Sequence, residues 1–509
     1  MADHLIRQLM SGMVVRAELG LDEPRGADAV RADEALAAIG RGDTALGIEL
    51  ARTIVAQGDA NDSLLPLAVS VAAAYADADR ARWADAGWFV ERGRRLGSGR
   101  RGAAADALQW ELDALAVVVE WQTFDGSAEY DKVAADLSDL RARNSLHAHH
   151  ASAMAAIGMV DLRRCAFAEA VASLTTAVRL ADPSSVRTLH TRTELLLAHV
   201  RCGRRPDAWA VLETVESALN EDDAPQWQAL VRTARMLPDA MNLKVPEVLD
   251  SWEAARRAVD EAWTVHADVL LAHARLAILL GTGEWEALGT HVDSIRSGPH
   301  RSIYDDHELR SIEADTSWIG GPTEDYREAV REWAPAEGAE ESPYFWIHRA
   351  QIADLDEQIE VMERHIERAN DLLEGTEDPL GAVLVRVKTG DLLTKRVSAV
   401  RGMEYWESAR EDLIRMDAHG MVSMLNVFIS LKAQEIVEDS ANPLDALTEQ
   451  QRKVVELVAR GLTSAEVASR LHVTKKTVDF HVGNALIRLD VESRREFRSL
   501  VERYGAVGR

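Results

Sequence analysis

Apolar residues recur at intervals of three and four through the first 435 positions of this 509-residue chain. This is the period of an amphipathic helix, and the strict alternation that marks a half-buried strand is nearly absent. Ala, Leu, Arg and Glu dominate the same stretch, and all four favour helices. A helical chain of this length rarely forms one bundle and usually stacks helix pairs. We therefore expect an all-α body over residues 1–435, as one solenoid or two subdomains.

Weak internal repeats support the stacking of helix pairs. After Ile157-Gly158, the chain places Ala170, Leu174 and Ala177 before a break at Asp182-Pro183. This spacing resembles the tetratricopeptide repeat, a unit of about 34 residues with two antiparallel helices. Similar turns precede an alanine at three further places, which are Gly203 with Ala208, Gly281 and Gly283 with Ala287, and Gly40 and Gly42 with Ala45. Because the period is irregular, the pattern fits either degenerate tetratricopeptide-like repeats or generic helical hairpins.

A break in the helical pattern separates the body from a C-terminal domain. Asn442-Pro443 ends a helix, because the residue before a proline is held away from the helical conformation. We expect a linker at residues 436–446 and a second domain at residues 447–509.

Capping residues predict four helices in the C-terminal domain. In a capping box, a Ser or Thr side chain accepts from the third amide of a helix, and a Glu or Gln side chain reaches back. Three pairs have this spacing, namely Thr448 with Gln451, Thr463 with Glu466, and Ser493 with Glu496. Gly461 is placed to end the first helix, and Thr474 to cap the third, which runs from Lys475 to about Leu489.

The second and third helices have the proportions of a helix-turn-helix. The second is short, ends near Leu471, and is followed by a tight turn at His472-Val473. One face of the longer third helix is apolar, with Val478, Val482, Ala485 and Leu489 in a single stripe. The opposite face is then free to enter the major groove of double-stranded DNA.

We assign two sets of DNA contacts to this third helix. Amides, hydroxyls and ammonium groups at its N-terminus can meet phosphates, and these belong to Thr474, Lys475, Lys476 and Thr477. Base edges can be read farther along the same face, where the chain places Asp479, Phe480, Gly483 and Asn484. An aspartate can accept from cytosine N4, and a phenylalanine ring can contact the methyl group of thymine.

The distribution of charge restricts DNA binding to the C-terminal domain. Residues 443–509 carry 12 Lys and Arg against 9 Asp and Glu, a net charge of +3. The remaining chain carries 46 against 75, a net charge of −29. Such an acidic body repels phosphate and should restrain the binding of DNA by the domain attached to it.

Signatures of enzymes and cofactors are missing from the sequence. There is no Gly-Lys pair, which excludes a P-loop, and the G-x-G-x-x-G match at residues 97–102 follows a helical stretch in place of the strand that dinucleotide binding needs. Cys165 and Cys202 have no partner at a metal-ligand spacing. The cluster of His147, His149 and His150 has no clear carboxylate partner, which favours solvent exposure over a metal site. We expect no catalytic residues, no cofactor and no metal.

The sequence also argues against a membrane protein. Its apolar runs, such as residues 269–280, fall short of the roughly 20 residues that span a bilayer. The first residues include an acid where a signal peptide is basic. We expect a cytoplasmic protein without a membrane partner.

A set of residues spread through positions 447–497 matches a known family without gaps. They are Leu447-Thr448, Gly461-Leu462-Thr463, Glu466-Val467-Ala468, Leu471, Lys476-Thr477-Val478, His481-Val482, Asn484, Arg488-Leu489 and Ser493-Arg494. Together they resemble the LuxR-type (NarL/FixJ) helix-turn-helix domain. In that family the positions of Asp479, Phe480 and Gly483 face the bases. Three positions depart from the family's pattern. Gln451 stands where the family usually has glutamate, Asp490 replaces the usual glycine, and Asp479 replaces a basic or neutral residue.

This resemblance implies a bacterial transcription regulator. The architecture is similar to large regulators of the MalT group, which also carry an ATPase module that is not apparent here. The implied function is one-component regulation, in which the body senses a ligand or partner protein and the domain binds promoter DNA as a homodimer and contacts RNA polymerase. The alternative is an interaction scaffold whose C-terminal module contacts protein. Asp479 and the modest positive charge favour that alternative, and Lys475-Lys476-Thr477 at a helix N-terminus disfavours it.

Overall fold

All regular structure in the described part of the chain is helical. The computed structural model describes residues 27–40, 43–57, 64–123, 127–146, 150–164, 166–181, 186–219, 225–240, 242–298, 306–318, 324–334, 339–374, 378–439, 443–489, 491 and 493–504. Within these ranges only α-helices and short 3-10 helices occur, and there is no strand. The predicted all-α fold class is confirmed.

The chain divides into two compact units, and the first comprises Met1–Glu341 with Gly375–Leu380. The helices of this unit are α2 (Ala27–Gly40), α3 (Thr44–Gln57), α4 (Leu65–Ala78), α5 (Trp83–Gly97), α6 (Ala103–Thr123), α7 (Ser127–Leu146), α8 (Ala151–Arg163), α9 (Phe167–Leu180), α10 (Val186–Arg201), α11 (Arg205–Ser217), α12 (Pro225–Ala240), α13 (Val245–Glu261), α14 (Val265–Thr282), α15 (Trp285–Arg296), α16 (Asp306–Trp318), α17 (Glu324–Trp333) and η2 (Ala339–Glu341).

The second unit comprises Ser342–Glu374 and Gly381–Arg509. Its helices are α18 (Pro343–Leu355), α19 (Ile359–Leu373), α20 (Pro379–Arg396), α21 (Ala399–Arg415), α22 (His419–Asp439), η3 (Pro443–Ala446), α23 (Glu449–Ala459), α24 (Ser464–Leu471), α25 (Lys475–Arg488) and α26 (Phe497–Tyr504).

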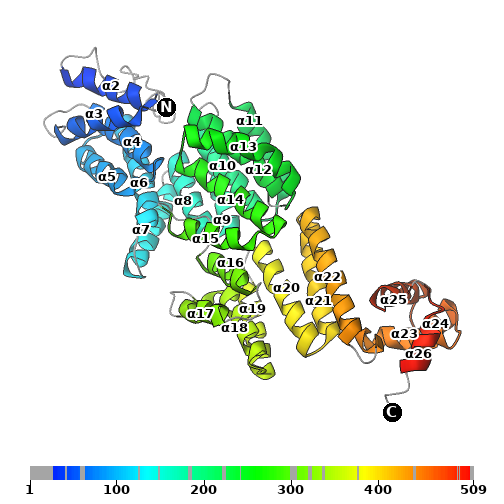
Figure 1. Cartoon of the computed structure of the whole chain (residues 1–509). Coiled ribbons are helices and arrows are strands. Elements are labelled where there is room, and N and C mark those ends of the chain that lie inside the picture. Colours follow the sequence, from blue (N-terminus) through cyan, green and yellow to red (C-terminus); the bar gives the residue numbers. More distant parts are fainter. Residues whose placement is uncertain are drawn as a thin grey trace. The chain divides into compact units, whose positions relative to one another are not determined.

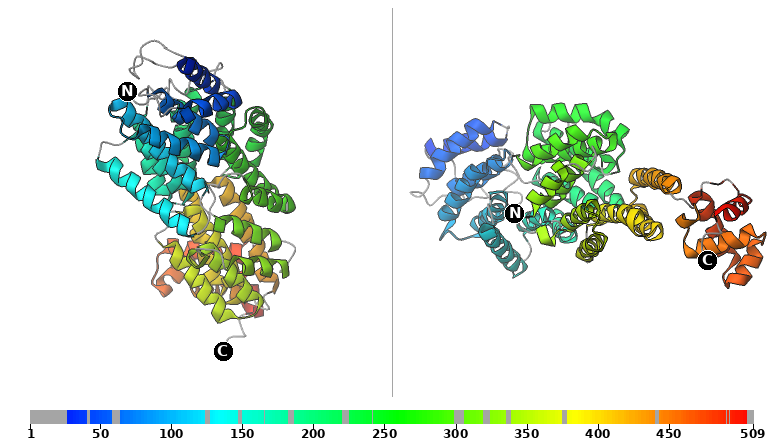
Figure 2. Two further views of the ribbon diagram at one scale, coloured as in Figure 1. Left: turned by 90° about the vertical axis from the view of Figure 1, so that its left-hand side faces the viewer. Right: turned by 60° about the horizontal axis from the view of Figure 1, so that its bottom comes forward.

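Consecutive helices pack against each other as hairpins, as the sequence predicts. In the first unit α4 pairs with α5, α8 with α9 and α12 with α13 (Figure 1, Figure 2). Gly158 shows why small residues recur at these crossings, because a Cβ atom there would lie 2.5 Å from Cγ of Leu174 in α9. Ala170 and Ala177 are buried in the same hairpin. Helix pairs thus bury their apolar faces against neighbouring pairs, which is the way a repeat array builds its core.

Two of the proposed repeat turns adopt the backbone that glycine permits. Gly203 and Gly283 have φ values of 66° and 72°, in the left-handed region that costs other residues a steric clash. Gly42 lies outside the described residues, as do His147 and His149. The ring of His150 stacks on that of Trp110, with 5.6 Å between the ring centroids.

The glycine-rich segment at residues 97–102 joins two helices. Gly97 ends α5, and Gly99 and Gly102 have φ values of 87° and 119° before α6 begins. No strand precedes the segment, so the dinucleotide-binding interpretation is excluded here.

One described helix, α14, is long and apolar enough to cross a membrane by length and composition. From the sequence, the apolar run at residues 269–280 is too short for this. The helix is 56% buried inside the protein, as expected for the core helix of a globular domain.

The linker is shorter than the predicted range of residues 436–446. Helix α22 continues to Asp439, so residues 436–439 are helical. Asn442 lies outside the described residues, and the 3-10 helix η3 begins at Pro443. Leu444 in η3 is buried in the core of the C-terminal domain, so this domain begins before residue 447. The proline ends no helix directly and instead starts the first turn of the domain.

The C-terminal domain has a hydrophobic core of its own. Its centre consists of Val454, Val455, Val467, Val478, Ala485 and Phe497, from four different helices. The first two predicted capping boxes are present. Thr448 accepts from the amide of Gln451 at 3.0 Å, and the Gln451 side chain accepts from the amide of Thr448 at 3.1 Å. Ser493 and Glu496 also contact each other, but the last helix starts only at Phe497, because residues 493–496 form a turn.

Candidate nucleic-acid interface

The short helix α24 is fixed at its start by a capping box. The amide of Glu466 donates to the Thr463 hydroxyl at 3.4 Å, and the Glu466 carboxylate accepts from the Thr463 amide at 2.8 Å. These hydrogen bonds lower the pKa of Glu466, with the backbone amide of Thr463 as the main cause. The cap anchors the entry to the helix-turn-helix, as the sequence predicted.

A single left-handed residue makes the turn between α24 and α25. His472 has φ 57° and ψ 38°, and the next amide, that of Val473, donates to the Ala468 carbonyl at 3.0 Å. Thr474 then caps α25 by accepting from the amide of Thr477 at 3.1 Å. The two hydroxyls of Thr474 and Thr477 also lie 2.7 Å apart. The tight turn predicted at His472-Val473 is therefore present, and it joins the helices labelled α24 and α25 in Figure 1.

Helix α25 has one buried face and one exposed face. Val478, Val482 and Ala485 are buried, and Leu489 follows them in the same core, which confirms the predicted stripe. All eight predicted DNA-contact residues lie away from this stripe. Exposed side chains belong to Thr474, Lys475, Lys476, Asp479 and Phe480, and half-buried positions are Thr477, Gly483 and Asn484. The fold thus brings the proposed phosphate and base contacts together on one surface.

The ammonium groups at the start of α25 are available for a ligand. Among the described residues, no carboxylate lies within ion-pair distance of Lys475 or Lys476. The N-terminal amides of the same helix add partial positive charge at this end. A phosphate can therefore meet two ammoniums and a helix N-terminus at one place.

An exposed apolar residue on α25 was missed by the sequence analysis. Ile487 is 77% exposed, and Phe480, seven residues earlier in the same helix, is 64% exposed. Residues seven apart lie nearly in line along a helix, so the two apolar side chains lie two turns apart on the exposed face. The sequence contains a signal for this exposure, because Ile487 is an apolar residue that lies outside the buried stripe of α25.

Arg488 ties the end of α25 to the start of α23. Its guanidinium donates to the Gln451 side-chain oxygen at 2.6 Å, and Gln451 is itself buried in the first capping box. Burial lowers the pKa of Arg488, while Glu407 and Glu404 act in the opposite direction. The neutral amide at position 451, where the resembling family usually has glutamate, leaves Arg488 without a counter-charge on α23.

We expect the substitution Gly483→Ala to stabilise the domain and to weaken DNA binding. A Cβ atom at Gly483 meets nothing within 4 Å, and alanine favours a helix interior by up to about 1 kcal/mol over glycine. If residue 483 approaches DNA closely, the added methyl group costs affinity. Thermal unfolding and DNA titration of the same variant measure the two effects.

The matched control is Gly461→Ala, which also has open space around its Cβ position. Its φ of 89° is unfavourable for alanine, so we expect a loss of roughly 1–2 kcal/mol. A Gly483→Ala variant with unchanged DNA affinity would place residue 483 away from the DNA.

Comparison with known proteins gives one family match. Residues 445–501 match the family described as GerE, "Bacterial regulatory proteins, luxR family". The "Nitrate/nitrite response regulator protein homolog" of Haemophilus influenzae is 35% identical over 81 residues, which cover 16% of this chain and 38% of the relative. "Response regulator protein VraR" of Staphylococcus aureus is 32% identical over 83 residues, covering 16% and 39%. The chain thus spans less than two-fifths of the length of these relatives.

One solved structure resembles the whole chain, but this similarity is weaker than the family match of the C-terminal domain. A chain from the "Crystal structure of APC/C hetero-tetramer Cut9-Hcn1" aligns with 97% of this chain and 98% of its own length. The sequence identity is 10% and the TM-score is 0.30, which is too low to assign a shared fold.

Proposed function

We propose that this protein is a DNA-binding transcription regulator, starting from the fact that residues 445–501 are a luxR-family helix-turn-helix domain. The observation that carries the proposal is the exposed face of α25. Its N-terminus presents Lys475 and Lys476, and its buried face is fully used in the core of the domain. Such a helix can enter the major groove with its first residues nearest the bases.

The proposed contacts follow the two sets assigned from the sequence. Phosphates would meet Thr474, Lys475, Lys476 and Thr477, and base edges would meet Asp479, Phe480, Gly483 and Asn484. The carboxylate of Asp479 would repel the DNA backbone unless it accepts from a cytosine amino group. We therefore expect a C-containing target site. The proposal includes no enzymatic step.

The helical body would supply the signal in this one-component scheme. It would sense a ligand or a partner protein in the cytoplasm and change the access of the domain to promoter DNA and RNA polymerase. The net charge of −29 outside residues 443–509 supports restraint by the body. Equal DNA affinity and stoichiometry for the full chain and for residues 440–509 would contradict this restraint, and the separate core of the domain makes the shorter chain a fair comparison.

Binding as a homodimer is the second part of the scheme. Two half-sites of a palindrome need two copies of the helix-turn-helix. Helix α22, which precedes the domain, carries Met424, Val427 and Leu431 on one face, and these side chains are 48%, 61% and 55% exposed. An exposed apolar stripe at helical spacing supports contact with a second copy.

The alternative function is a protein-interaction scaffold. The observation that favours it is the exposure of two large apolar side chains, Phe480 and Ile487, on one face of α25, because exposed apolar residues that lie near each other are common where proteins bind other proteins. In that case the C-terminal module would contact a protein through the same helix face.

Binding of the full-length protein to fragmented genomic DNA of its host tests the proposal. The retained fragments are sequenced over a series of salt concentrations. Recovery of a shared palindrome, with affinity that falls as salt rises and two chains per site, is the expected result. Absence of retention even at low salt would favour the scaffold.

A further inference from the structure

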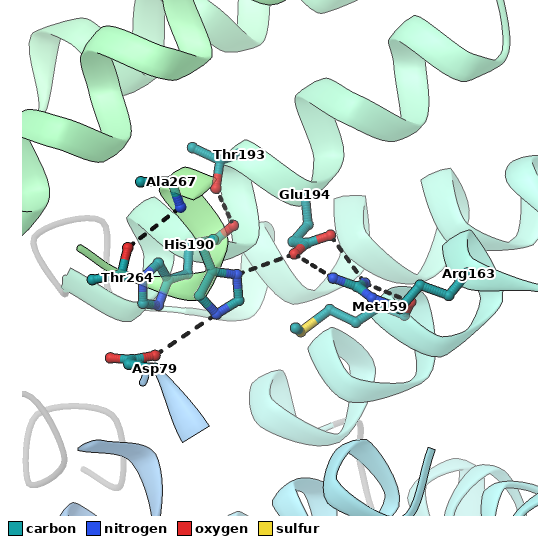
Figure 3. A network of polar contacts seen from close by, with 9 residues as sticks. Asp79, Met159, Arg163, His190, Thr193, Glu194, Thr264 and Ala267 are labelled. Atoms are coloured by element: carbon teal, nitrogen blue, oxygen red, sulfur yellow. Dashed lines mark hydrogen bonds and ion pairs between the residues drawn. The ribbon is translucent and has the colours of Figure 1, made fainter. Parts of the chain in front are cut away.

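Three potential metal ligands from distant parts of the sequence meet in the first unit. They are Asp79, His190 and His266, and one donor atom from each lies within 4.8 Å of the other two. The Nε2 atom of His266 lies 3.7 Å from Oδ1 of Asp79. The rings of His190 and His266 lie face to face, with 4.3 Å between their centroids. Figure 3 shows Asp79 and His190 at this convergence.

The backbone holds these side chains together from three helices. Asp79 follows the last residue of α4, and its carbonyl oxygen accepts from the amide of Val265 at 2.9 Å. His266 is the residue after Val265, in the first turn of α14, where the Thr264 side chain caps the helix. His190 projects from α10. The direct hydrogen bond between two chain segments fixes the carboxylate and one imidazole at the same place.

A second carboxylate orients one of the imidazoles. Oε1 of Glu194 lies 3.3 Å from Nδ1 of His266, and Glu194 is one helical turn after His190 in α10. Arg163 holds Glu194 in turn through two contacts of 3.1 and 3.2 Å, drawn in Figure 3. In the tautomer in which Nδ1–H donates to Glu194, the free electron pair of the His266 imidazole is on Nε2, the nitrogen nearer Asp79. A carboxylate behind a histidine in this way is the usual outer shell of a metal-binding imidazole.

We propose that Asp79, His190 and His266 bind a divalent transition-metal ion of the zinc class, with Glu194 as a positioning residue for His266. Two imidazole nitrogens and one carboxylate oxygen suit zinc and its neighbours, whereas calcium and magnesium prefer oxygen ligands alone. Ligands about 2.1 Å from a tetrahedral ion lie about 3.4 Å apart. The 3.7 Å between His266 and Asp79 is close to this spacing, and the imidazole of His190 has to turn toward the ion.

The surroundings leave room for a further ligand of the metal. The three residues line a cavity with about 930 Å³ of empty space, part of which is open to solvent. Trp83, Trp227 and Met159 contribute to its largely apolar wall. A zinc ion with three protein ligands keeps one position open, which a small molecule with an oxygen or nitrogen donor can occupy. The metal site does not depend on the proposed DNA binding, and its failure would leave that proposal intact.

Metal binding by the full-length protein tests the inference. The protein is treated with a chelator and then titrated with Co²⁺ and, in competition with a chromophoric chelator, with Zn²⁺. We expect one ion per chain and a visible Co²⁺ spectrum of four- or five-fold coordination. Asp79→Asn and His266→Gln should each weaken Zn²⁺ binding by at least about 100-fold, and Glu194→Gln by about 10- to 100-fold.

The control variant is His147→Ala with His149→Ala, which replaces two of the three histidines of the local cluster and should leave the stoichiometry and the spectrum unchanged. Thermal unfolding of every metal-free variant identifies those that retain the fold. If metal is lost in the control variant but kept in folded Asp79→Asn, or if the wild-type protein retains no Zn²⁺ against the competing chelator, the inference is overturned. The same side chains then form a polar network in which the imidazole of His266 lies between the carboxylates of Asp79 and Glu194.

Discussion

Replacing both Lys475 and Lys476 with alanine is expected to weaken DNA binding by about 30-fold per domain at physiological salt. Each ammonium that neutralises a phosphate contributes about 0.9 to the slope of log affinity against log salt concentration. Loss of both lowers the slope by roughly 1.8, and at about 0.15 M salt this corresponds to the expected loss of affinity. DNA titrations at four or more salt concentrations measure the slope directly.

The matched control for the lysine pair is Lys453→Ala. Lys453 lies in α23 of the same domain, where its ammonium pairs with Glu449. Its removal changes the net charge of the domain without altering α25. The slope should therefore change by much less than the value of about 0.9 expected for one phosphate contact. Because Lys475 and Lys476 are exposed, the double variant should keep its fold, which thermal unfolding verifies. An unchanged slope in the double variant would contradict phosphate binding at this helix end.

Comparing the lysine variant with polar substitutions of Phe480 and Ile487 separates the two proposed functions. A protein-binding module that uses Phe480 and Ile487 would lose its partner on polar substitution of these residues but not on loss of the lysines. A DNA-binding module would depend on the lysines and on Phe480, since phosphate contacts hold the helix in register while side chains read the bases, and Ile487 is not among its proposed contacts.

The C-terminal domain was predictable because its signals are local. A capping box spans four consecutive residues, as from Thr463 to Glu466, and its hydrogen bonds form wherever the chain places the helix end. The stripe from Val478 to Ala485 likewise needs only helical periodicity. The prediction failed in detail at the start of α26, which begins at Phe497 and not near Ser493, and at the end of α22, which continues to Asp439. Both are helix ends, which local patterns describe poorly.

The three residues proposed to bind metal were not predictable from local patterns. The sequence analysis considered His147, His149 and His150 because they are adjacent in the chain. Asp79, His190 and His266 share no spacing, and they meet because the end of α4 lies against the start of α14 and α10 brings His190 to the same place. A ligand set assembled from three helices leaves no periodic trace in the sequence.

The second large effect is expected for Gly402→Ala, in the helices that precede the C-terminal domain. Gly402 in α21 and Gly390 in α20 lie where these two helices cross closely. A Cβ atom at position 402 would overlap the Thr394 hydroxyl and the Gly390 carbonyl, and it would lie 2.8 Å from the Thr394 amide. Two of these obstacles are backbone atoms, which cannot turn away as a flexible side chain can.

The helices must therefore move apart to admit the methyl group, and this loosens the packing of Trp406. That side chain is fully buried, and its indole N–H donates to the Val387 carbonyl at 2.9 Å. Overpacking of this kind costs typically 1–3 kcal/mol, and the backbone overlap places Gly402→Ala near the upper end, at about 3 kcal/mol. Hydrogen exchange of peptides from α20 and α21 should then speed up by roughly 100-fold, since 1.4 kcal/mol corresponds to a factor of ten.

Gly289→Ala in α15 is the control, because a Cβ atom there meets only the Thr316 side chain, at an ordinary 3.4 Å from its hydroxyl. Alanine is the better helix former, so protection of α15 should be unchanged or higher. If Gly402→Ala exchanges as slowly as the wild-type protein, α20 and α21 do not cross at Gly390 and Gly402. If exchange accelerates in these helices while the DNA-binding domain stays protected, the domain is an independently stable unit, and a signal that shifts α20–α22 can reposition it without unfolding it.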